Sequence, residues 1–192
     1  MGTKVRNIRM TSTKQSLIQA FVNLVNEKDF EKITIADLTK GAHVNRATFY
    51  AHFNDKYELL DYIVREYIST AIINRTKGEV TFDQQGIAKL VLALCDFYQQ
   101  PSMNCRSSYI ALVVPQLTDK AIIELRAYLL KGLESLCSAE EVAFYAPIFA
   151  QVIHESALQW ATGKVTLDKE KMAERTAVLV VNGFHSSVSS LS

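Results

Sequence analysis

Residues 45–52 bring together side chains that commonly contact nucleic acid, within the length of one short helix. The segment has no acidic residue and contains Asn45, Arg46, Ala47, Thr48, Tyr50 and His52. An Arg side chain can donate two hydrogen bonds to guanine N7 and O6 in the major groove, and an Ala methyl can touch the methyl group of thymine. We therefore expect Arg46 and Ala47 to read bases. Contacts to phosphates, which position a protein on DNA, are expected from Thr34, Thr48, Tyr50, His52 and Lys56.

Two helix starts position these side chains. Thr34 precedes a periodic apolar run and is followed three residues later by Asp37, close to the capping-box pattern. Asn45 repeats the arrangement, and residues 40–43 form a turn of the length found in a helix-turn-helix. The apolar side chains expected to be buried and to hold the second helix are Val44, Phe49 and Phe53. The sequence therefore predicts a helix-turn-helix that places its second helix in the major groove of DNA.

Lys56 lies in the first turn of a third helix, which begins at Asn54 or Asp55. A cation there faces the positive end of the helix dipole, at a cost of a few tenths of a kcal/mol up to about 1 kcal/mol. A bound phosphate would reverse the sign, because the Lys side chain and the free backbone N–H groups would both point at it. We interpret Lys56 as a phosphate contact; the alternative is a surface lysine on a solvated turn.

Residues 10–65 carry a set of positions that resembles the DNA-binding domain of the TetR (tetracycline-repressor-like) family of bacterial regulators. The matching positions are Ile35-Ala36, Ala42, Val44, Thr48, Phe49-Tyr50, His52-Phe53, Lys56 and Leu59. The resemblance implies an all-α homodimer with an N-terminal DNA-binding domain and a C-terminal effector-binding and dimerisation domain. His43 departs from it, because the family commonly has Gly there. A left-handed backbone at His costs about 1 kcal/mol.

Apolar periodicity and helix caps predict an all-α chain of about nine helices. A mobile basic arm is expected at 1–10, followed by a helix from near Thr11–Thr13 to about Glu27. The domains are expected at 1–55, for the helix-turn-helix, and 56–192, with a helix at 55–73 connecting them. Beyond the link at 74–81, the sequence predicts helices at 83–100, 107–114 (interrupted or ended by Pro115), 119–136, 139–162 (opened by a capping box at Ser138 and Glu141) and 168–187.

Charge and cysteine content agree with a DNA-binding module attached to a second domain. Residues 1–54 contain eight Lys or Arg and four acids, so they carry +4, and the remaining residues carry −3. The three Cys residues form no C-x-x-C pair, which favours reduced thiols. No apolar signal region and no run of about 18 apolar residues occurs, so we expect a cytoplasmic protein.

The last two long helices and a set of aromatic residues predict a dimer and a ligand site. Apolar faces occur at Ala150, Ile153, Ala157 and Trp160, and at Ala177, Val178, Val181 and Phe184. Two such helices meeting their symmetry mates would form a four-helix interface; ordinary core helices are the alternative. Pockets for small organic ligands are lined by aromatic side chains, and the candidates are Tyr62, Phe97, Tyr109, Phe149 and Trp160, with His154 and Glu155 able to orient a ligand. Plain core packing would explain any one of them equally well.

Catalytic and metal motifs are missing from the sequence. The four His residues form no H-E-x-x-H pattern, and neither a G-x-S-x-G motif nor a phosphate-binding Gly loop occurs. We therefore expect no catalysis, cofactor or metal. The sequence predicts a ligand-responsive transcriptional regulator, a repressor released from a palindromic operator by a small apolar or amphipathic molecule. The alternatives are a transcriptional activator or a protein-interaction module on the same scaffold, and an α-helical enzyme that uses the aromatic pocket.

Overall fold

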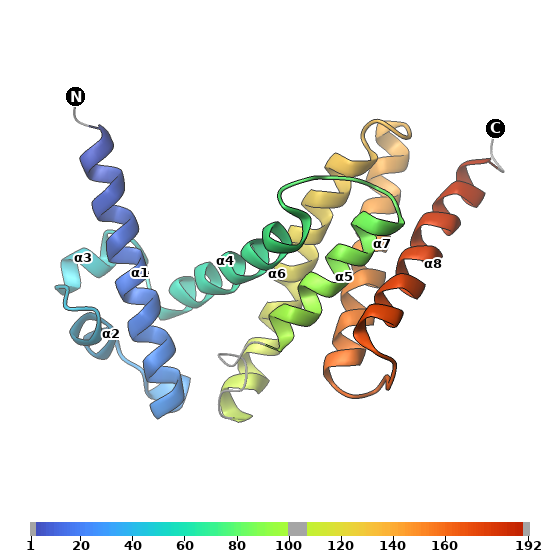
Figure 1. Cartoon of the computed structure of the whole chain (residues 1–192). Helices are drawn as coiled ribbons and strands as arrows, with labels where there is room; N and C mark the ends of the chain where they lie inside the picture. The colour runs from blue at the N-terminus through green and yellow to red at the C-terminus, as the bar shows by residue number, and fades with distance from the viewer. Residues whose placement is uncertain (1–2, 100–106, 190–192) are drawn as a thin grey trace. The chain divides into compact units, whose positions relative to one another are not determined.

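The computed structural model describes the backbone of residues 3–99 and 107–189 and the side chains of residues 12–99 and 118–188. Over these residues the chain forms eight α-helices, one short 3-10 helix and no strand, which confirms the all-α prediction (Figure 1). The elements are α1 (Thr3–Glu27), η1 (Phe30–Lys32), α2 (Ile35–Gly41), α3 (Arg46–Tyr50), α4 (Lys56–Thr76), α5 (Gln84–Tyr98), α6 (Ser107–Leu133), α7 (Ala139–Ala161) and α8 (Lys169–Ser189).

The helices form two compact units. The N-terminal unit extends to Val64 and includes residues 107–116 of α6, and the C-terminal unit contains the other described residues from Arg65 onward. The boundary falls inside α4, the helix that we expected to connect two domains. No helix in the described part of the chain has the length and apolarity needed to span a lipid bilayer.

Two helices differ from the prediction. α1 begins at Thr3, so residues 3–10 are helical rather than an irregular arm; they contain no Gly or Pro that would stop the helix from extending. α6 is a single helix of 27 residues with Pro115 inside it, where two helices were predicted. A proline removes one backbone donor and disturbs one turn, which a helix of this length tolerates. Pro147 inside α7 is a second example.

The N-terminal unit is a small helical core that holds α2 and α3 against α1. The buried face of α1 contains Leu17, Ala20, Phe21 and Val25. Gly41 brings α2 close to α1, since a Cβ on it would lie only 3.0 Å from the Cβ of Ala20. Leu38 of α2 and Phe49 of α3 are completely buried. Burial of side chains of this size contributes roughly 1.5–3 kcal/mol each, and it fixes α2 and α3 to one scaffold.

In the C-terminal unit α5 packs against both α7 and α8, which also contact each other. Its core includes an aromatic cluster of Phe82, Tyr145, Phe149 and Phe184, in which Tyr145 and Phe149 stack with ring centroids 5.5 Å apart. Asp96 of α5 binds Arg75 of α4 and Lys169 of α8, and thus joins three helices. Burial opposes ionisation of Asp96, but these hydrogen bonds outweigh it and lower its pKa.

Both predicted signals at the ends of α7 are confirmed. Ser138 and Glu141 form a complete capping box. At the other end Gly163 has a φ of 72°. The amide of Gly163 donates to the carbonyl of Trp160 and that of Lys164 to Gln159, the pattern that closes a helix with a left-handed residue.

Candidate nucleic-acid interface

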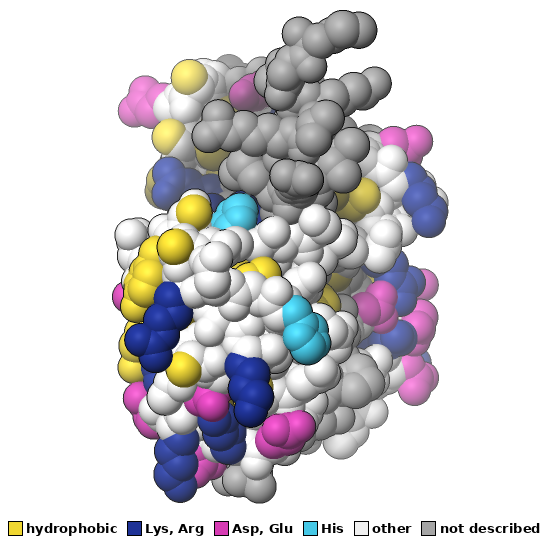
Figure 2. Space-filling view, turned by 90° about the vertical axis from the view of Figure 1, so that its left-hand side faces the viewer, with side chains coloured by type: hydrophobic (Ala, Val, Ile, Leu, Met, Phe, Trp, Pro, Cys, Tyr) yellow, Lys and Arg dark blue, Asp and Glu magenta, His cyan; other side chains and the backbone are white. Residues whose placement is uncertain are grey.

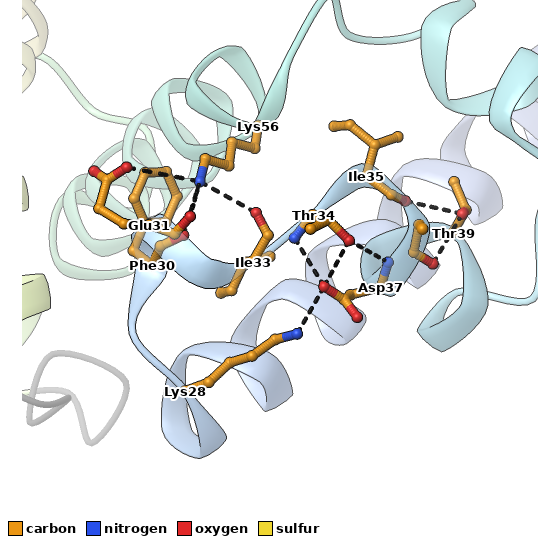
Figure 3. A network of polar contacts seen from close by, with 10 residues as sticks. Lys28, Phe30, Glu31, Ile33, Thr34, Ile35, Asp37, Thr39 and Lys56 are labelled. Carbon is orange, nitrogen blue, oxygen red and sulfur yellow. Dashed lines mark hydrogen bonds and ion pairs between the residues drawn. The ribbon is translucent and has the colours of Figure 1, made fainter.

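The start of α2 is held by a network around Asp37 (Figure 3). Thr34 is the N-cap: its hydroxyl accepts from the amide of Asp37, and the Asp37 carboxylate accepts from the amide and hydroxyl of Thr34 at 2.8 and 2.7 Å. Lys28, the residue directly after α1, lies 2.6 Å from the same carboxylate oxygen. The hydrogen bonds from Lys28 and Thr34 lower the pKa of Asp37 far below its ordinary value. The predicted capping box is thus confirmed, and Lys28 anchors it to α1.

The turn between α2 and α3 is closed by His43, the residue that departs from the family pattern. His43 has a φ of 55°, in the left-handed region that we expected. Its amide donates to the carbonyl of Lys40, and the amide of Val44 donates to that of Thr39. These two bonds make a Schellman motif, which satisfies the last carbonyls of α2. The turn therefore forms with His in place of Gly.

Asn45 caps α3 and directs its first residues outward. Its side-chain oxygen accepts from the amide of Thr48 at 2.7 Å and from the Thr48 hydroxyl at 2.9 Å. Arg46 and Ala47 are exposed, and no hydrogen bond or ion pair holds the Arg46 guanidinium within the described part of the protein. The face of the molecule in Figure 2 carries Lys, Arg and His side chains, together with some Asp and Glu, on a surface that is mostly uncharged. An unpaired guanidinium at the tip of a short helix is free to reach base edges.

The other side of α3 is buried, as predicted for its two aromatic anchors. Phe49 and Phe53 lie in the core, whereas Val44 is half-buried. Phe49 packs edge-on against Tyr50, whose own side chain is 56% exposed. α3 is therefore fixed from behind and presents its N-terminal residues and Tyr50 to solvent.

The residues predicted to contact phosphates differ in their surroundings. The hydroxyls of Thr34 and Thr48 both take part in helix caps, and Tyr50 is exposed. His52 is half-buried, and its Nδ1 atom is enclosed without a hydrogen-bond partner among the described residues. Burial, together with the nearby charge of Lys14, lowers the pKa of His52, which favours a neutral ring.

Lys56 has a set of partners that the sequence did not suggest. Its ammonium group donates to the backbone carbonyls of Phe30, Glu31 and Ile33 at 2.9, 3.0 and 3.1 Å (Figure 3). It also lies 4.6 Å from the ring centroid of Phe30. The three N–H donors of the ammonium group are thus engaged inside the protein. No sequence signal could have found these partners, since they lie 23 to 26 residues away along the chain.

The comparisons with known proteins agree with this geometry. Residues 17–63 match the family described as bacterial regulatory proteins, tetR family. This segment of the chain is therefore a tetR-family domain. The domain contains the helix-turn-helix of DNA-binding transcriptional regulators.

Two relatives come from Bacillus subtilis (strain 168). The uncharacterized HTH-type transcriptional regulator YxbF is 36% identical over 69 residues, which are 35% of this chain and only 18% of YxbF. YvkB, also named an uncharacterized HTH-type transcriptional regulator, is 22% identical over 187 residues, or 91% of this chain and 98% of YvkB. The stronger identity is therefore confined to about a third of this chain.

Solved structures share the fold of about nine tenths of the chain. The dihydroxyacetone kinase operon activator DhaS superposes with a TM-score of 0.57 at 19% identity, covering 89% of this chain and 95% of DhaS. RolR, solved in complex with the ligand resorcinol, has a TM-score of 0.55 at 18% identity, covering 92% of this chain and 89% of RolR. At these identities the likeness shows the fold alone.

The residues predicted to bind a ligand belong to both units of the chain. Tyr62 belongs to the N-terminal unit, where the Lys14 ammonium lies 4.3 Å from its ring centroid. Phe97 and Phe149 are buried in the C-terminal unit, and the indole of Trp160 donates to the carbonyl of Leu167. The side chain of Tyr109 lies outside the described residues. The assignment of these five residues to a ligand site stays a prediction.

A polar pair within the C-terminal core was not anticipated. The Tyr98 hydroxyl oxygen lies 2.8 Å from Nε2 of His154, and His154 is only 1% exposed. Burial raises the pKa of Tyr98 and lowers that of His154, so both groups are neutral near pH 7. The adjacent Glu155 is exposed. Of the two polar residues predicted to orient a ligand, only His154 faces the interior.

Proposed function

We propose that this regulator is a dimeric repressor that binds a palindromic operator and is released by a small apolar or amphipathic ligand. The observation that carries the DNA-reading role is the exposed, unpaired Arg46 at the start of α3, held by the Asn45 cap and the buried Phe49. Arg46 would donate to guanine, and Ala47 would touch thymine methyl groups. Asn45, Tyr50 and the partly buried His52 would lie against the sugar–phosphate backbone.

Dimerisation would use the outward faces of α7 and α8. The residues first expected there are mostly core residues: Ala150, Ile153, Ala157, Ala177, Val181 and Phe184 are buried within the chain. Of the predicted set Val178 is exposed, and so are Phe144 and Ile148 of α7 and Leu179 of α8, which is 66% exposed. These apolar side chains would be covered by the same helices of a second copy.

Gly183 on α8 supports the same proposal. A Gly inside a helix costs about 1 kcal/mol relative to Ala. A Cβ at Gly183 would meet nothing within 4 Å, so no contact within the described residues requires Gly there. It lies four residues after Leu179, on the same face of the helix. A close approach by a helix of the partner copy would explain both the Gly at position 183 and the exposed apolar side chain of Leu179.

A ligand would act through the C-terminal unit. RolR, which shares the fold, was solved in complex with resorcinol. The C-terminal unit of this chain contains several aromatic side chains, with the polar Tyr98–His154 pair among them. The ligand would favour a dimer in which the two α3 helices no longer match the half-site spacing. Coupling of 1–3 kcal/mol is typical and would change operator occupancy about 5–150-fold.

Activation of transcription is the second candidate. DhaS, which has the same fold, is named an operon activator. Both roles require the same DNA-reading helix and the same dimer. They differ in where the operator lies relative to the promoter, and a reporter gene with the operator placed upstream or downstream of the promoter distinguishes them.

The test is selection of bound duplexes from a random-sequence library, followed by sequencing. The proposal expects an inverted repeat with half-sites about one helical turn, 34–36 Å, apart. Arg46→Ala, which leaves the fold untouched, is expected to erase one conserved guanine of each half-site. Enrichment of no sequence at low salt would contradict the proposal and favour a protein-interaction role. Enrichment of a single unrepeated half-site would contradict binding as a dimer.

A further inference from the structure

Lys56 is enclosed at the point where α4 begins beside η1. Only 15% of its side chain is exposed, although a lysine in the first turn of a helix usually extends into water. Its ammonium group lies among three carbonyl oxygens and within 4.6 Å of the Phe30 ring centroid, while the Glu31 carboxylate is 3.9 Å away. A charge with this number of internal partners is held in place by the protein.

The three carbonyls belong to the segment that leads directly into α2. Phe30 and Glu31 are the first two residues of η1, and Ile33 follows η1 immediately before the N-cap Thr34. The carbonyl end of a helical turn carries partial negative charge, which a cation stabilises. The cation that is unfavourable at the start of α4 is therefore favourable at the end of η1.

The same segment is held from its other side. Lys28 pairs with Asp37, which accepts from Thr34, so the entrance to α2 is fixed by Lys28, directly after α1, and by Lys56 of α4 (Figure 3). Tyr57, next to Lys56, packs edge-on against Phe30 at 5.2 Å between ring centroids. α2 and α3 are joined by a closed turn, so a shift at the entrance to α2 would also move α3.

We infer that Lys56 is a positioning residue: it orients the helix-turn-helix by donating to the carbonyls of residues 30–33, and it does not contact DNA phosphates through its side chain. The inference rests on DNA binding by this domain. It replaces the interpretation made from sequence, in which the position of Lys56 in the first turn suggested a phosphate partner.

Two variants separate the two roles. Lys56→Met retains most of the side-chain length and removes the charge, and Lys32→Met is the matched control, since Lys32 is in the same segment with its side chain 74% exposed. Affinity is measured for a selected operator duplex and for a random-sequence duplex, each over a range of salt concentrations. Amide hydrogen exchange at Lys32 and Ile33, whose N–H groups donate within η1, is measured without DNA.

The positioning role has a specific signature. Lys56→Met is expected to weaken operator binding about tenfold or more. Its affinity for random-sequence DNA and the salt dependence of its DNA affinity should stay as in Lys32→Met. Amide exchange at Lys32 and Ile33 is expected to accelerate in Lys56→Met. A phosphate contact predicts that both affinities fall together, that the salt slope is shallower by about 0.9 than in Lys32→Met, and that exchange is unchanged. That outcome, or no difference between the two Met variants, overturns the inference.

Lys56→Arg keeps the test decisive if the Met variant does not fold. A planar guanidinium binds phosphate at least as well as an ammonium group but does not fit the three converging carbonyls. The positioning role expects operator binding to stay impaired, whereas a phosphate contact expects it to be restored. The exchange measurement needs no DNA, so it tests Lys56 even if the proposed operator binding fails.

Discussion

The side chain of Asn45 accepts two hydrogen bonds from Thr48, one from its amide and one from its hydroxyl. These bonds start a helix of only five residues. A helix this short has little stability of its own, because nucleation is unfavourable and most helical stability comes from tertiary packing. The Asn45 cap and the buried Phe49 are therefore what keep α3 in place for DNA.

Replacing Asn45 with Ala is expected to lower the free energy of unfolding by about 1 kcal/mol, the usual cost of a lost N-cap. Asn45→Asp keeps the acceptor oxygen and adds charge that suits a helix N-terminus. It is expected to preserve stability but to weaken DNA binding through repulsion of phosphates. Urea denaturation and DNA titration measure the two effects, and equal stability of all three proteins would show that the cap contributes nothing.

Arg46→Ala is expected to change DNA recognition without changing stability. Arg46 is exposed and without a partner among the described residues, so its removal should leave the free energy of unfolding within about 0.5 kcal/mol. Discrimination at one base pair per half-site should fall by about 1–3 kcal/mol. Lys40→Ala, which removes another exposed cation of the same module, should weaken all duplexes alike. Binding to duplexes with single base changes distinguishes these results, and a sequence-independent loss in Arg46→Ala would remove it from base reading.

Leu179→Asp is expected to convert the dimer to a monomer with an intact fold. The side chain is 66% exposed in the single chain, so Asp there meets water in the monomer but would be buried in the proposed interface. Ile123→Asp is the control, since Ile123 of α6 is also an exposed apolar residue. Sedimentation velocity should show a monomer for the first variant and a dimer for the second; a dimer in both would place the interface elsewhere.

The buried His154 is expected to make stability depend on pH. Burial lowers its folded-state pKa below the ordinary 6.5, so between the two pKa values the unfolded chain binds more protons than the folded one. The contribution is therefore fully present above about pH 6.5 and is lost as the pH falls towards the folded-state pKa. His52, whose pKa is also lowered, adds to the loss in the same direction.

His154→Gln is expected to reduce this loss, since Gln cannot gain a proton. The exposed His185 gives the control variant His185→Gln. Urea denaturation between pH 5 and 8 measures the effect. A pH dependence that is the same in His154→Gln as in the unmodified protein would assign the loss to other groups.

Helix starts and stops could be predicted because their physics is local. The partner of Thr34 is Asp37, and the partner of Ser138 is Glu141, each three residues away. The left-handed residues at His43 and Gly163 likewise close hydrogen bonds within their own turn. The sequence by itself therefore determined the all-α fold, the helix-turn-helix and the exposed start of α3.

Distant contacts were decided only by the tertiary structure. The Lys56 ammonium and the Phe30 carbonyl are 26 residues apart along the chain, and Tyr98 and His154 are 56 apart. Periodicity showed that α7 and α8 have apolar faces, but it did not show that Val181 would be buried and Leu179 exposed. Which side of a helix becomes core depends on the helices that pack against it, and which charge a lysine meets depends on the segments that folding brings to it.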